Sequence, residues 1–153
     1  MEPKIVKKRG FMVVGAKKRL KTGETAEIPQ LWGELMQRMH EINHLVNDGN
    51  SYGVMANYDE ATEAFDYIAA FEVSEVADVP EGLVSLEIPP HTYAIFPSTM
   101  AKIGETYDTI YQEWLPQSEY EHAYTPEFEL YPPTFDPEEA ASEFQIYIPV
   151  KEP

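Results

Sequence analysis

Two segments of matching pattern, IPQLWGELMQRM at residues 28–39 and IGETYDTIYQEW at residues 103–114, decide the fold of this chain. In both, apolar or aromatic residues recur at steps of three and four, which places them on one face of a helix. At a shift of 75 residues the matched pairs are Ile28 with Ile103, Trp32 with Tyr107, Leu35 with Ile110, Met36 with Tyr111 and Met39 with Trp114. We expect two equivalent amphipathic helices, the first continuing to Val46 and the second ending near Leu115.

Strand-like runs flank both predicted helices in the same order. The runs before and after the first helix are residues 4–8, 11–16, 52–58 and 65–73, and those around the second are 83–88, 92–96, 128–131 and 144–150. The order β-β-α-β-β therefore occurs twice. We expect a single domain over residues 1–153, with related halves of about 1–76 and 83–153.

The predicted fold class is α+β, with duplicated β-α-β-β halves related by a pseudo-twofold axis. Two helices can cover only one face of an antiparallel sheet, so the other face needs another use. We expect that uncovered face to form a central ligand cleft where the halves meet.

Composition excludes several classes of protein. The 153 residues carry 27 Asp and Glu against 11 Lys and Arg, a net charge of -16, which opposes direct binding to nucleic acid. No cysteine is present, the glycines form no phosphate-binding loop, and no apolar run is long enough to span a membrane. We expect a cytoplasmic protein without a cofactor.

The cationic residues are clustered, since eight of the 11 lie in the first 21 positions. They form either a basic hairpin beside acidic neighbours or a docking site for an acidic partner.

The segment His40-Glu41-Ile42-Asn43-His44 has the spacing of a zinc hydrolase motif, in which two histidines one helical turn apart hold the metal. On the expected helix His40 and His44 point to solvent, and Ile42 points into the core. The residues that follow do not continue the motif. We therefore predict two surface histidines and no metal site.

Aromatic residues gather around one predicted strand late in the chain, Pro126 to Pro132, and seven of the ten tyrosines follow residue 90. In a strand, Phe128 and Leu130 share one face, and Glu129 and Tyr131 share the other. If the first pair packs under the helices, the second faces the cleft. A carboxylate among aromatic rings is costly without a partner, and an organic cation would relieve that cost. A solvated Glu129 on an exposed sheet face is equally compatible with the pattern.

Five short motifs occur in a characteristic order along nearly the whole chain. They are Pro3 to Val6, Ile28 to Trp32, Tyr52 to Val54, Pro126 to Tyr131 and Ile146 to Val150. In their order and spacing they resemble the GyrI-like family, also described as AraC-type effector-binding or multidrug-binding domains. Because Met1 leads directly into the first strand, we expect a stand-alone member.

The resemblance implies the roles of the site residues. A glutamate on this strand reads the positive charge of lipophilic drugs in the family, which assigns that role to Glu129, and Tyr131 shares the wall. Tyr52 is related to Glu129 by a shift of 77 and is expected in the same cleft. Weaker lining candidates are Trp114, Tyr93 and Tyr147, whereas Trp32 and Tyr107 are expected to fill the core beneath the sheet.

We therefore predict a module that captures amphipathic, often cationic, small molecules, rather than an enzyme. One alternative suggested by the resemblance is a hydrolase of cyclopropane-bearing genotoxins, with Glu129 as general base and a tyrosine such as Tyr131 or Tyr147 donating a proton. Another is a protein that interacts with DNA gyrase. All three interpretations stay open on the sequence alone.

Overall fold

The computed structural model describes residues 2–152, and the expected order of elements is confirmed. The strands and helices are β1 (Lys4–Lys8), β2 (Phe11–Lys21), α1 (Ile28–Arg38), β3 (Ser51–Asp59), β4 (Ala64–Val73), β5 (Val84–Ile88), β6 (His91–Thr99), α2 (Ile103–Thr109), α3 (Leu115–Gln117), β7 (Glu121–His122), β8 (Glu127–Tyr131) and β9 (Glu143–Lys151). A π-helical segment, Ile110–Trp114, joins α2 to α3, so residues 103–117 form one continuous helix.

The strand order across the sheet is symmetric about its centre. It runs β1-β6-β9-β8-β3-β4-β2-β5, and the short β7 pairs with β9 outside this path. All of these pairings are antiparallel. Equivalent strands of the two halves therefore lie at equal distances from the centre, where β3 meets β8. This is the pseudo-twofold arrangement that the repeated sequence pattern predicted.

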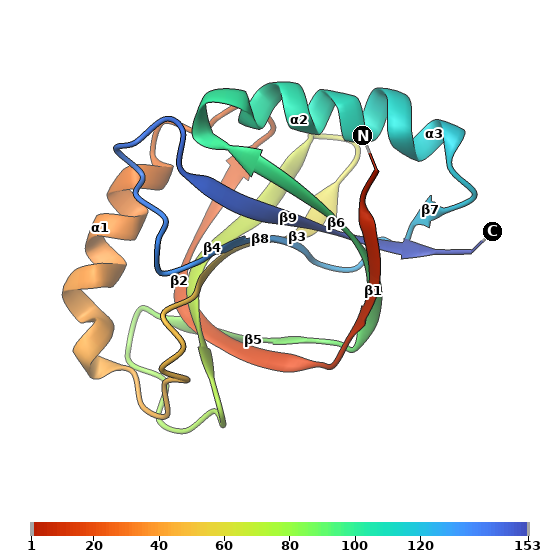
Figure 1. Cartoon of the computed structure of the whole chain (residues 1–153). Coiled ribbons are helices and arrows are strands. Elements are labelled where there is room, and N and C mark those ends of the chain that lie inside the picture. Colours follow the sequence, from red (N-terminus) through yellow and green to blue (C-terminus); the bar gives the residue numbers. More distant parts are fainter. Residues whose placement is uncertain (1, 153) are drawn as a thin grey trace.

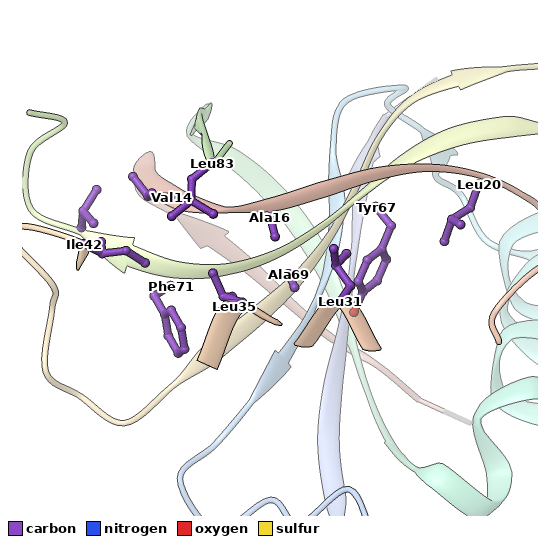
Figure 2. Packing of buried hydrophobic residues seen from close by; sticks show 11 residues of the cluster. Val14, Ala16, Leu20, Leu31, Leu35, Ile42, Tyr67, Ala69, Phe71 and Leu83 are labelled. Atoms are coloured by element: carbon purple, nitrogen blue, oxygen red, sulfur yellow. The ribbon is translucent and has the colours of Figure 1, made fainter. Parts of the chain in front are cut away.

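Both helices cover the same face of the sheet (Figure 1). On the α1 side, Leu31 and Leu35 are buried against residues of β2 and β4, and Figure 2 shows them among Val14, Ala16, Tyr67, Ala69 and Phe71. Each such leucine stabilises the fold by roughly 1.5–3 kcal/mol. On the other side, Ile110 packs with Phe96, Ile146 and other residues of β6 and β9.

Aromatic and aliphatic side chains fill the face that no helix covers. The edge strands β1 and β5 curl beneath this face (Figure 1), and the turns before β2 and β6 approach each other at Gly10 and Pro90. The enclosed cluster contains Phe11, Val13, Tyr52, Val54, Ile68, Ala70, Ile88, Tyr93, Ile95 and Phe128. The structure thus differs from the expected cleft on this face, because the curled edges turn it into a second core.

The first helix is shorter than expected and ends at Arg38, followed by a short 3₁₀ turn over Met39–Glu41. Leu45 and Val46 continue the apolar spacing of a helix, but they instead pair with the end of β4. His44 has a left-handed backbone (φ 63°) and its Nε2 lies 3.0 Å from a carboxylate oxygen of Glu75. His40 and His44 therefore share no helix, and the zinc motif lacks its required geometry.

None of the helices within residues 2–152 has the length and apolar character needed to cross a membrane.

We predict opposite effects for two glycine-to-alanine changes. A Cβ at Gly15 would lie 1.9 Å from the carbonyl oxygen of Ala69 in β4, so Gly15→Ala should lower the free energy of unfolding by about 3 kcal/mol. Gly33 lies in α1 with open space around it, so Gly33→Ala should raise that free energy by roughly 0.5–1 kcal/mol. Urea unfolding measures both, and an unchanged midpoint for Gly15→Ala would contradict the close strand contact.

Candidate functional site

The carboxylate of Glu129 lies at the centre of the sheet, on the face that the helices cover. Only 6% of the residue is exposed. It accepts a hydrogen bond of 2.6 Å from the Tyr107 hydroxyl on the long helix and another from the Tyr131 hydroxyl on its own strand. Among the ion pairs of residues 2–152, none involves Glu129. A buried acidic group is therefore held by neutral donors alone.

Gly53 makes room for the phenol groups beside Glu129. It lies opposite Glu129 in the pairing of β3 with β8. A Cβ on Gly53 would lie 2.6 Å from the Tyr67 hydroxyl oxygen and 3.3 Å from that of Tyr131. The missing side chain thus leaves the space in which these two hydroxyl groups converge, and the sequence carries no signal that would have assigned this role.

The helix α1 closes the other side of the site with Trp32. Its indole Nε1 donates a 2.9 Å hydrogen bond to the Tyr67 hydroxyl, and its ring meets that of Tyr131 edge to face at 5.9 Å. The sequence predicted that Trp32 and Tyr107 fill the core beneath the sheet. Both do pack against the cores beneath the helices, and they also lie beside the Glu129 carboxylate or its tyrosine partners, one from each helix.

Burial raises the pKa of the Glu129 carboxyl, and the hydrogen bonds from Tyr107 and Tyr131 only partly oppose this effect. Burial and the charge of Glu129 also raise the pKa values of Tyr107 and Tyr131 well above that of free tyrosine. The two phenols therefore keep their protons and remain donors. The site holds a strained acidic group that would be relieved by a positive charge.

The structure brings together only some of the residues proposed from the sequence. Glu129 and Tyr131 are in contact. Trp114 lies on the same face, further along the helix, where its ring packs against Phe96 and Tyr120. The other three candidates lie on the opposite face of the sheet, where they pack around Phe128; they are Tyr52, Tyr93 and Tyr147.

The expected orientation of β8 is reversed in the structure. Phe128 packs in the helix-free core, so Glu129 and Tyr131 face the helices. The repeat shift of 77 matched Glu129 with Tyr52, but this shift is one residue out of phase for β3 and β8. Gly53, and not Tyr52, pairs with Glu129 and shares its face of the sheet. A slip of one residue moves a side chain to the other face of a sheet.

The site is closed in this conformation. Two surface grooves, of about 340 and 410 Å³, lie beside α1 and beside β1 and β9, and neither is lined by Glu129. The carboxylate is nearly fully buried and in contact with the hydroxyls of Tyr107 and Tyr131.

Solved structures share this architecture. The structure of SAV2435 bound to tetraphenylphosphonium has a TM-score of 0.77 and 18% identity, covering 99% of this chain and 94% of that one. The C-terminal domain of EcmrR has a TM-score of 0.77 and 14% identity, covering 99% of this chain and 98% of the domain. The Vibrio cholerae integron cassette protein VCH_CASS2 has a TM-score of 0.64 and 22% identity, covering 98% and 96%. At these identities the likeness shows the fold.

The sequence comparisons identify the family of this chain, whereas the solved structures show only its fold. The transcriptional regulator BrlR of Pseudomonas aeruginosa is 34% identical over 154 residues, which cover 98% of this chain and 56% of the regulator. The chain therefore spans little more than half the length of that relative. The family model Cass2, described as integron-associated effector binding protein, matches residues 4–150. This match covers nearly the whole chain, and the protein belongs to the family of integron-associated effector binding proteins.

Proposed function

We propose that this chain binds lipophilic organic cations, with Glu129 as the opposing charge. The observation that supports this most directly is the burial of Glu129 with two neutral phenols as its partners. An ionised carboxylate without a cationic partner is expensive to bury, and a bound cation would recover much of that cost.

The surroundings of the carboxylate suit a ligand that is both charged and apolar. Tyr107 and Tyr131 bond to the carboxylate, and the rings of Trp32 and Tyr67 lie next to these partners or to each other. A cation over such a ring gains about 0.5–2 kcal/mol. The similar structure of SAV2435 holds tetraphenylphosphonium, which has this combination of charge and apolar surface.

The biological role that we infer is to sense or sequester such a molecule. A relative that is a transcriptional regulator supports a sensing role. The net charge of -16 repels phosphates, so we propose that this chain contacts no nucleic acid itself.

The two other interpretations, a hydrolase of genotoxins and a partner of DNA gyrase, gain no comparable support. Burial makes the hydroxyl of Tyr131 a weaker acid than free tyrosine, which does not favour it as the proton donor of a hydrolase. No observation in residues 2–152 favours DNA gyrase as a partner. Ligand binding is therefore the function that we put to the test.

Replacing Glu129 by Gln should weaken cationic ligands selectively. Glutamine keeps the size and one acceptor oxygen but removes the charge, and a charge-assisted contact contributes about 1.5–3 kcal/mol, or roughly 10–100-fold in affinity. Isothermal titration with methyltriphenylphosphonium and its neutral relative triphenylphosphine oxide measures the difference. Equal losses for both compounds would show that Glu129 does not recognise charge.

The same variant should change how stability depends on pH. Because the pKa of Glu129 is raised in the folded state, its contribution to stability is complete at low pH and is lost as the pH rises through that raised value. Glu129→Gln should therefore unfold at a higher temperature than the wild type at pH 7, without ligand. The difference should shrink as the pH is lowered. A wild type that is more stable than the variant at pH 7 would contradict a strained carboxylate.

A further inference from the structure

A second glutamate, Glu127, lies two residues before Glu129 on the same face of β8. Same-face neighbours on a strand are about 7 Å apart. The Tyr111 hydroxyl donates to the Glu127 carboxylate, at 2.8 and 2.9 Å from its two oxygens. The side chain of Glu127 is 19% exposed, so this carboxylate, unlike that of Glu129, is open to solvent on one side.

The other partner of Glu127 is a histidine, His122. His122 Nε2 lies 3.6 Å from a Glu127 oxygen. Its Nδ1 accepts a 2.9 Å hydrogen bond from the backbone N–H of Tyr124. No Lys or Arg forms an ion pair with Glu127 within residues 2–152.

A row of aromatic rings runs from Tyr107, the partner of Glu129, past the partners of Glu127. The Tyr111 ring stacks on Tyr107, the partner of Glu129, with centroids 6.4 Å apart and planes at 10°. On its other side Tyr111 stacks on His122 at 6.2 Å, and His122 lies 5.3 Å from the ring of Tyr124. Tyr124 is 77% exposed. We call Tyr111, His122 and Tyr124 with Glu127 the outer aromatic cluster.

We propose that the outer aromatic cluster is a second cation subsite, and that the ligands of this chain include lipophilic dications whose charges are about 7 Å apart. One charge would lie at Glu129 and the other at Glu127, with the row of rings between them covering the apolar body. This inference rests on the proposed function of Glu129, to which it adds a class of ligand.

The outer subsite should contribute less to binding affinity than Glu129 does, because water screens a partly exposed charge. An exposed ion pair together with one exposed cation-π contact corresponds to about a tenfold gain in affinity. The dication should therefore bind more tightly than a monocation of the same shape by about this factor.

Benzyl viologen provides a rigid probe, since its two pyridinium charges are held about 7 Å apart, close to the spacing of same-face residues on a strand. The matched monocation is N-benzyl-4-(4-benzylphenyl)pyridinium, in which carbon replaces one ring nitrogen and both benzyl groups are kept. Calorimetric titration of both into the whole chain compares the wild type with Glu127→Gln and Glu129→Gln. Glu87→Gln is the control, because it removes one charge from an exposed position on the edge strand β5.

We expect Glu127→Gln to weaken benzyl viologen by up to about fivefold, because it removes the ion pair and leaves the cation-π contact, and to leave the monocation within twofold of the wild type. Tyr124→Ala, at an exposed position, should weaken only the dication without disturbing the fold. Equal affinities of the wild type for both probes, or equal effects of Glu127→Gln and Glu87→Gln, would overturn the outer subsite. If Glu129→Gln left the monocation unaffected, the proposed function itself would fail, and failure of both probes to bind the wild type would overturn both proposals.

Discussion

The burial of one carboxylate among neutral phenols is the constraint on which the site depends. Glu129 lies under the helices and accepts hydrogen bonds from Tyr107 and Tyr131, yet no cation approaches it within residues 2–152. Folding gains nothing from this arrangement, because removing an acidic group from water raises its free energy more than two phenol bonds restore. Such a cost is typical of functional sites, where a ligand completes the interaction that the protein leaves open.

The duplicated fold explains why the carboxylate can be held there. The two halves meet at β3 and β8, so β8 is contacted by a side chain of the long helix of its own half and by one of α1 of the other half. Trp32 reaches the site from α1 and Tyr107 from α2, while Gly53 of β3 leaves space for the hydroxyls of Tyr67 and Tyr131. Each half supplies residues that the other lacks, and the sheet core on the opposite face, built around Phe128, keeps β8 in position.

Much of the fold, but less of the site, could be predicted from the sequence. Helical spacing and the repeated order of elements gave both helices and the pseudo-symmetric sheet. The orientation of β8 could not be derived, because both faces of its sheet are buried and Phe128, Leu130 and Tyr131 are all apolar enough for either. The condition that Phe128 packs under the helices is not met, and Tyr52, expected beside Glu129 from the shift of 77, lies on the other face. Ile42 and Val46 lengthened the predicted first helix because their spacing imitates its period, whereas Val46 bonds to the end of β4. Contacts such as Trp32 to Tyr67 depend on packing across the sheet, which no local pattern encodes.

The ionisation of Glu129 can be followed directly by NMR, from the side-chain carboxyl carbon of selectively labelled protein as the pH is varied. In the free protein, we expect the pKa of Glu129 to lie above that of an ordinary glutamate, because burial disfavours its charged form. Saturation with methyltriphenylphosphonium should lower the pKa, since a neighbouring positive charge favours the carboxylate. An ordinary pKa in the free protein, or a raised pKa that the cation leaves unchanged, would contradict the account.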